Sequence, residues 1–130
     1  MSAPSFNLSG RRALVTGSFQ GIGLALARSL AAQGAEVIFN GRDATKLSAV
    51  AAHCASDGLA VTAHAFDVSD ESAVTAAIGP IDILFNNDGI HRRGPLATMA
   101  LTDWQAVLDT NLTSAFLGSR AFVPAMIERQ

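Results

Sequence analysis

The stretch Thr-Gly-Ser-Phe-Gln-Gly-Ile-Gly at residues 16–23 has the residue types and the spacing that suit phosphate binding. It follows the apolar run at 12–15 and opens an apolar helical pattern, so it lies between a predicted strand and a predicted helix. Gly17 allows a tight turn, Gly21 lets the backbone approach a pyrophosphate, and Gly23 lets the helix pack closely. The helix N-terminus then offers N–H groups and a partial positive charge to the phosphates. Glycines that serve only packing are the alternative, and the strand-and-helix context favours dinucleotide binding over it.

Polar residues follow the other predicted strands, where a bound dinucleotide would need them. The second strand is followed by Asn40 at its tip and by Arg42. An acidic residue there would bind a ribose 2′-hydroxyl, whereas an arginine suits a 2′-phosphate, so the pattern favours NADP over NAD. A solvated turn residue is the alternative for Arg42. Asp67, after the third strand, can accept from an adenine amino group or can simply be a turn residue.

The elements that must position these residues alternate along the chain. Strands are predicted at 12–16, 35–39, 60–66 and 81–85, and helices at 21–33, 43–56, 70–78 and 102–128. Asp43 and Asp70 can cap the second and third helices, and Gly34 can end the first. Alternation with right-handed crossovers predicts an α/β fold, a parallel sheet in the strand order 3-2-1-4. Ligands bind such a sheet at the carboxyl ends of strands one and four.

Composition excludes several other classes of protein. The chain has 130 residues, 49% of them hydrophobic, a net charge of −2 and a single cysteine, Cys54. Dispersed basic residues argue against nucleic-acid binding, and no apolar run is long enough for a membrane span. His53, His64 and His91 lack metal-ligand spacing, so no metal site is expected. We expect a cytoplasmic protein in which residues 1–130 form one NAD(P)-binding domain.

Taken together, the motifs resemble those of the short-chain dehydrogenase/reductase family. The phosphate loop T-G-x-x-x-G-I-G is matched at 16–23, the Asp-Val pair at 67–68, N-N-A-G at 86–89 with one change, and the helix asparagine at Asn111. The resemblance implies a Rossmann-type doubly wound sheet and an oxidoreductase that acts on CH–OH groups. The segments at 40–42 and 89–96 look most like the gluconate 5-dehydrogenase subgroup, which interconverts gluconate and 5-ketogluconate with NADP(H).

The resemblance also implies a role for each matched residue. Asn111 belongs to the catalytic tetrad, in which its main-chain carbonyl holds a water of the proton relay. Asn86 is expected to tie neighbouring strands together. Arg92 and Arg93 are loop residues that are either solvated or in contact with a substrate carboxylate. The expected cofactor-binding residues are Gly17, Ser18, Gln20, Gly21 and Ile22 at the pyrophosphate, Asn40 and Arg42 at the adenosine ribose, Asp67 and Val68 at adenine, and Asn87 and Gly89 at the ribose beside it.

The chain departs from the family pattern in three respects. The family transfers the substrate proton through a tyrosine assisted by a serine and a lysine, but this sequence contains no tyrosine, and its only lysine is Lys46. The sheet is expected to stop before its fifth strand, and the third helix to be roughly seven residues short, close to two turns. Asp88 stands where the family has alanine, and we expect its carboxylate to weaken cofactor binding.

Three interpretations follow. The first is the N-terminal, cofactor-binding part of an NADP-dependent dehydrogenase for a polyol or sugar acid, inactive as this chain alone and able to form a homo-oligomer in the complete enzyme. The second is a non-catalytic dinucleotide-binding module. The third is a remnant that expresses poorly or aggregates through its exposed fourth strand and the bare face of its last helix. For the parent enzyme, a 3-oxoacyl-type reductase is the alternative to the sugar-acid dehydrogenase.

Overall fold

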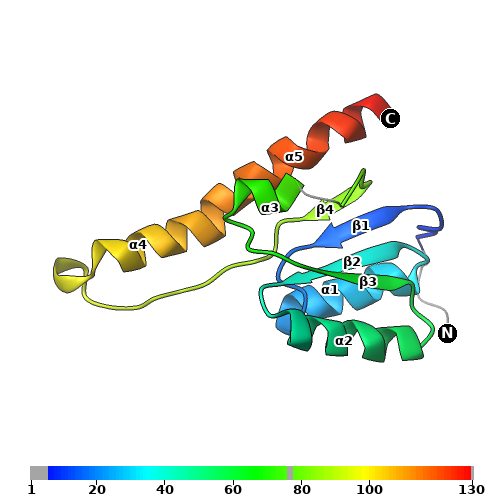
Figure 1. Cartoon of the computed structure of the whole chain (residues 1–130), viewed down its shortest axis with the longest axis horizontal. Helices are drawn as coiled ribbons and strands as arrows, with labels where there is room; N and C mark the ends of the chain where they lie inside the picture. The colour runs from blue at the N-terminus through cyan, green and yellow to red at the C-terminus, as the bar shows by residue number, and fades with distance from the viewer. Residues whose placement is uncertain (1–5, 76–77, 130) are drawn as a thin grey trace.

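A four-stranded parallel sheet in the order β3-β2-β1-β4 forms the centre of the molecule (Figure 1). The computed structural model describes residues 6–75 and 78–129. The strands are β1 (Arg12–Val15), β2 (Glu36–Gly41), β3 (Val61–Ala65) and β4 (Ile83–Phe85). The predicted α/β fold and strand order are confirmed, and β4 is an edge of the sheet in the described residues.

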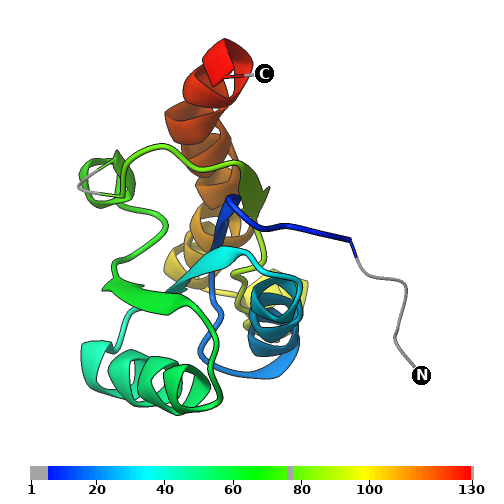
Figure 2. The ribbon, with the colours of Figure 1, turned by 90° about the vertical axis from the view of Figure 1, so that its right-hand side faces the viewer.

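Helices cover both faces of the sheet, which makes it doubly wound (Figures 1 and 2). Alternating side chains of β1 and β2 explain this, because Ala13 and Val37 belong to one core and Leu14 and Ile38 to the other. The first core packs under α1 (Gly21–Ala32) and α2 (Ala44–Ser56), and the second under α3 (Glu71–Thr75) and α5 (Ser114–Arg129).

The predicted helix boundaries are set by the expected residues. Asp43 accepts a hydrogen bond from the Lys46 N–H at 3.1 Å, and Asp70 accepts from Ala73 at 3.2 Å. Gly34, with a φ of +100°, follows the end of α1. The third helix, predicted at 70–78, spans Glu71–Thr75, and positions 76 and 77 lie outside the described residues.

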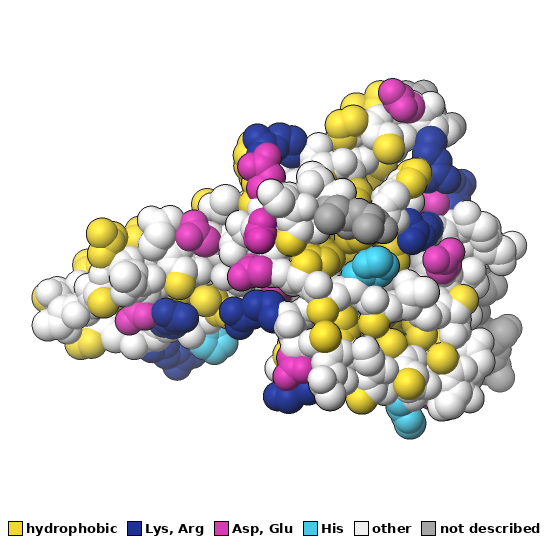
Figure 3. Space-filling model, viewed as in Figure 1, with side chains coloured by type: hydrophobic (Ala, Val, Ile, Leu, Met, Phe, Trp, Pro, Cys, Tyr) yellow, Lys and Arg dark blue, Asp and Glu magenta, His cyan; other side chains and the backbone are white. Residues whose placement is uncertain are grey.

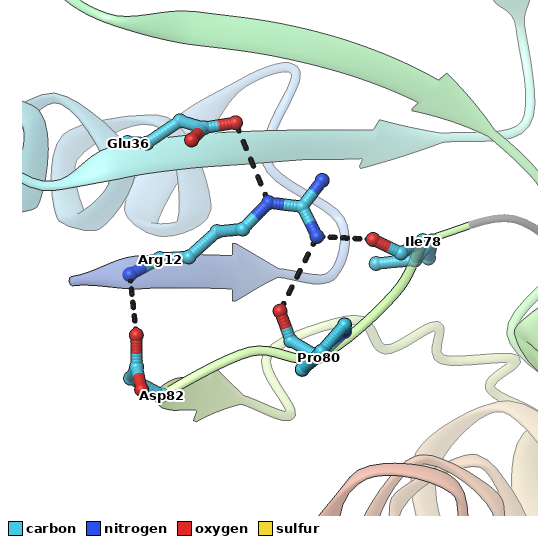
Figure 4. A network of polar contacts seen from close by, with 5 residues as sticks. All are labelled: Arg12, Glu36, Ile78, Pro80 and Asp82. Atoms are coloured by element: carbon cyan, nitrogen blue, oxygen red, sulfur yellow. Dashed lines mark hydrogen bonds and ion pairs between the residues drawn. The ribbon is translucent and has the colours of Figure 1, made fainter. Parts of the chain in front are cut away.

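β4 begins two residues later than predicted because Asp82 replaces strand pairing with a side-chain contact. Its carboxylate accepts from the Arg12 N–H at 2.9 Å, and its own N–H donates to the Arg12 carbonyl at 2.7 Å. The Arg12 guanidinium donates to the carbonyls of Ile78 and Pro80 and pairs with Glu36 (Figure 4). This network joins β1, β2 and the segment before β4 at the amino end of the strands.

The predicted helix at 102–128 is continuous but not uniform. It consists of α4 (Leu101–Leu108), a π-helical turn η2 (Asp109–Thr113) and α5, and a 3-10 turn, η1 (Leu96–Thr98), precedes it. α4 projects away from the sheet as an arm (Figure 1). Hydrophobic side chains are visible along this arm (Figure 3), and those most exposed on α4, η2 and α5 are Leu101, Trp104, Leu112, Phe116, Val123 and Ile127.

No described helix combines the length and the apolar character that a membrane crossing requires.

Candidate functional site

The glycine-rich loop between β1 and α1 has the backbone that its sequence predicts. Gly17 and Gly21 both have a φ of +61°, a region that side chains disfavour. A Cβ on Gly23 would lie 2.2 Å from the Gly17 carbonyl oxygen and 2.5 Å from the Asn87 amide nitrogen. Gly23 therefore allows α1 to pack against the loop, and any larger residue at this position would push the helix away from the loop.

The N-terminus of α1 is open toward this loop. Gln20, the N-cap residue, is extended and makes no side-chain capping bond, and the first turn contains no acidic residue. A Cβ built on Gly21 meets no atom within 4 Å, and Ile22 beside it is exposed. The first N–H groups of the helix thus face space that an anion can enter.

Asn40 supports the loop from beneath. Contrary to the prediction that the second strand ends at Phe39, β2 continues through Gly41, because Asn40 and Gly41 pair with His64 and Ala65 of β3. The Asn40 side chain is fully buried: its Oδ1 accepts from the Gly17 N–H at 3.1 Å, and its Nδ2 donates to the carbonyls of His64 and Phe66. Its amide is therefore satisfied within the protein.

Ser18 completes this support. Its hydroxyl accepts from the Asn40 N–H at 2.9 Å, and its own N–H donates to the Asn40 carbonyl at 2.8 Å. Both residues are fully buried, so they connect the loop to β2 from inside the protein.

Asn87 connects the end of β4 to the same loop. Its side-chain amide donates to the carbonyls of Thr16 and Gly17 at 3.1 and 3.2 Å, and its N–H donates to the Thr16 hydroxyl. The role of tying strands together, expected of Asn86, thus belongs to Asn87. Asn86 is exposed and donates weakly to Ser119 of α5, at 3.4 Å.

Three charged residues, Arg42, Asp67 and Asp88, follow β2, β3 and β4 respectively. The Asp67 carboxylate accepts from the Ser69 hydroxyl and N–H, and these bonds, with the charge of Arg42, lower its pKa. Burial raises the pKa of Asp88, opposed by a hydrogen bond from the Gly89 N–H and by Arg42, while Asp67 raises it further. Arg42 therefore acts electrostatically on both carboxylates.

Asn111 holds the segment that follows β4. It lies in the π-helical turn, and its side-chain amide both accepts from the Ile90 N–H and donates to the Ile90 carbonyl, each at 2.7 Å. π-helical turns inside longer helices are frequent at functional sites. Farther along the same segment, Arg92 forms an ion pair with Asp103 of α4 at 2.7 Å.

An open groove unites these elements. It encloses about 970 Å³, including the part open to solvent. Of the predicted residues, Ser18, Asn40 and Val68 lie buried outside its lining, and Asp67 and Asn111 are also not among the lining residues. Phe19 and Ile90 also line the groove, although neither was predicted as a site residue. Each is apolar and is adjacent in sequence to a predicted residue, Gln20 or Gly89. The lining residues are Gly17, Phe19, Gln20, Gly21, Ile22, Gly23, Gly41, Arg42, Asn87, Asp88, Gly89 and Ile90.

The groove fits a dinucleotide better than a metal ion. It combines an uncapped helix N-terminus, empty space at Gly21 and a cation at Arg42, and these suit a diphosphate with a further phosphate. Among residues 6–75 and 78–129, no group of three or more His, Cys, Asp or Glu side chains could hold a metal ion.

Comparisons with known proteins agree with this geometry. Residues 11–130 match the sequence profile of the short chain dehydrogenase family. Gluconate 5-dehydrogenase of Gluconobacter oxydans (strain 621H) is 47% identical over 137 aligned positions, which cover 99% of this chain and 54% of that protein. Because the aligned positions outnumber the 130 residues here, that relative contains residues without a counterpart in this chain.

Solved structures show the same fold. A gluconate 5-dehydrogenase from Burkholderia cenocepacia J2315 in complex with NADP and tartrate is 42% identical, with a TM-score of 0.87, over 95% of this chain and 51% of that one. A short chain dehydrogenase/reductase from Burkholderia phymatum in complex with NAD is 29% identical, with a TM-score of 0.89, over 95% of this chain and 47% of that one. The chain spans about half the length of the curated relatives that it matches.

Proposed function

Because the chain belongs to the short-chain dehydrogenase/reductase family, we propose that residues 1–130 form the NADP(H)-binding part of an oxidoreductase for a polyol or sugar acid. The groove at the carboxyl ends of β1, β2 and β4 is the observation that supports this proposal most directly. Its backbone donors, its open helix terminus and its cation lie together at the switch point of the sheet, where dinucleotides bind in this class of fold.

Each part of the groove then has one task. The N–H groups that begin α1 receive the diphosphate, Arg42 receives the 2′-phosphate, and Asn87 and Gly89 flank the ribose. Outside the lining, Asp67 and the buried Val68 form the segment after β3 that we assign to the adenine end, while Ser18 and Asn40 hold the loop in place. When bound, NADP(H) supplies or accepts the hydride at its nicotinamide ring.

NADP is the preferred cofactor in this proposal. Arg42 takes part in no ion pair within 4 Å among residues 6–75 and 78–129, so its guanidinium is available to a phosphate. The gluconate 5-dehydrogenase neighbour that contains NADP supports the same choice. The relatives that act on gluconate and 5-ketogluconate support a sugar acid as the substrate.

We expect this chain by itself to bind cofactor without transferring hydride. Its 130 residues include no tyrosine, and its one lysine, Lys46, lies on α2 outside the groove. A non-catalytic dinucleotide-binding module is therefore the second candidate function. Asn111 contacts the loop after β4 through Ile90, and we assign it a part in the proton relay of the complete enzyme.

A pair of glycine substitutions tests cofactor binding. Gly21 and Gly58 both have positive φ, and a Cβ on either meets no atom within 4 Å, but only Gly21 lines the groove. Each change to alanine costs about 1–2 kcal/mol of backbone strain. We expect Gly21→Ala to weaken NADPH binding about tenfold or more, because its methyl group enters the space for the diphosphate. Gly58→Ala should lose similar stability and keep the parent affinity.

Calorimetric titration with NADPH, and thermal melts of both variants, provide the measurements. If the parent chain does not bind NADPH, or if both variants bind it equally well, the groove is not a dinucleotide site. Binding together with hydride transfer to 5-ketogluconate would exclude the non-catalytic module.

A further inference from the structure

The Asp88 carboxylate lies against Gly17 on the wall of the groove. A Cβ built on Gly17 would be 2.8 Å from Asp88 Oδ1 and 2.9 Å from its Cα, so Asp88 occupies the space that a side chain at position 17 would take. Oδ1 accepts from the Gly89 N–H at 2.9 Å. Oδ2 has no hydrogen-bond partner in the described part of the chain, which leaves it available to a ligand.

Asp88 lines the same groove as Arg42, the cation proposed to bind the 2′-phosphate of the cofactor. Arg42, Asp67 and Asp88 come from the segments after β2, β3 and β4. The charge of Arg42 lowers the pKa of both carboxylates, and the charge of Asp67 raises the pKa of Asp88. One positive charge thus faces two negative charges, and the local balance is negative.

Gly17 and Asp88 line the same groove as Arg42 and Gly21, so a ribose that joins a phosphate at Arg42 to a diphosphate at Gly21 lies in the groove whose wall contains Asp88. A 2′-hydroxyl on that ribose can donate to a carboxylate oxygen, whereas a 2′-phosphate is a dianion that the same carboxylate repels. Asp88 therefore attracts the 2′-hydroxyl of NAD(H) and repels the 2′-phosphate of NADP(H).

We propose that Asp88 is a specificity-determining residue of this groove, which lowers its preference for NADP(H) over NAD(H). The proposal rests on the proposed function, since it requires that the groove bind a dinucleotide. It differs from a general weakening of binding, because the two cofactors must respond differently.

The test compares NADPH and NADH affinities of the parent chain, Asp88→Asn and Glu128→Gln by calorimetry. Asparagine retains an acceptor for the Gly89 N–H, so the loop keeps its contact. Glu128 is exposed near the far end of α5, and its substitution removes one negative charge outside the groove. We expect Asp88→Asn to tighten NADPH binding about three- to tenfold, leave NADH binding unchanged or weaker, and so raise the selectivity ratio. Glu128→Gln should leave this ratio as in the parent.

The pH dependence gives a second readout. Protonation of Asp88 removes the repulsion that the phosphate meets, so the selectivity of the parent for NADPH should rise as pH falls, toward the value of Asp88→Asn. The 2′-phosphate titrates alike in the parent chain and in Asp88→Asn, so the difference between their pH profiles reports the titration of Asp88. The charged groups that act on Asp88 are Arg42 and Asp67.

Equal changes for both cofactors, or weaker NADPH binding by Asp88→Asn, would overturn this proposal and leave the proposed function standing. Absence of binding for both cofactors in the parent chain would overturn the two together.

Discussion

Asn40 acts at the scale of a single residue by joining the glycine loop to β2 and β3. Its buried amide serves the Gly17 N–H and the carbonyls of His64 and Phe66. Removing it would leave buried polar groups without partners, and each such group costs about 1–3 kcal/mol. We therefore expect Asn40→Ala to lower the free energy of unfolding by at least this amount, as measured by urea denaturation.

Asn86→Ala is the matched control, because Asn86 is exposed and makes one hydrogen bond at 3.4 Å. Its substitution should change stability by no more than about 0.5 kcal/mol. A stable Asn40→Ala variant whose only defect is weaker cofactor binding would instead mean that Asn40 faces the ribose directly, as its position in the sequence suggested.

The neighbouring asparagines show where residue-level prediction from the sequence ends. Both asparagines follow β4, but the Asn86 side chain contacts Ser119 of α5 and the Asn87 side chain contacts the loop after β1. The register of β4 on β1, which pairs Phe85 with Val15, selects Asn87. A sequence motif identifies the pair of residues, but the register depends on packing between segments about 70 positions apart.

At the scale of elements, the sequence predicts the features that depend on residues close to one another in the chain. The strand order follows from the alternation of strands and helices, and the caps at Asp43 and Asp70 depend on contacts within a few residues. The exceptions come from long-range contacts. β2 extends to Gly41 because β3 offers it partners, and β4 starts late because the Asp82 side chain meets Arg12.

The π-helical turn also makes a long-range contact, through the Asn111 side chain. The pair of 2.7 Å hydrogen bonds to Ile90 fixes the segment after β4 against the long helix. We expect Asn111→Ala to accelerate amide hydrogen exchange at Ile90 about tenfold or more, because its N–H loses its acceptor. The unfolding free energy should change little, since both hydrogen bonds lie at an exposed site.

Thr113→Ala provides the control, as an exposed neighbour within the same π-helical turn. Equal exchange at Ile90 in both variants would show that the segment is held by something other than the Asn111 amide.

At the scale of the whole molecule, the long helix presents a stripe of apolar side chains to solvent. Leu101, Trp104, Leu112, Phe116 and Ile127 are each at least half exposed. The steps between them are sums of three and four residues, which is typical of a helix face that packs against another surface. The same property accounts for the interpretation that the chain associates through this surface.

Two charged substitutions on this stripe should therefore suppress self-association. Leu112 and Ile127 are 67% and 61% exposed, so lysines at both positions can be solvated without disturbing the core. Losing the burial of two such side chains weakens an interface by roughly 2–4 kcal/mol, so Leu112→Lys with Ile127→Lys should raise the dissociation constant of the self-associated chain at least tenfold. Sedimentation velocity over a range of concentrations measures this dissociation constant.

The variant Thr102→Lys with Thr113→Lys adds the same charge at exposed polar positions of the same helix and should associate like the parent. If both double variants dissociate alike, net charge rather than the apolar stripe governs association, and a parent chain that is monomeric throughout would show that the stripe does not bind a second copy.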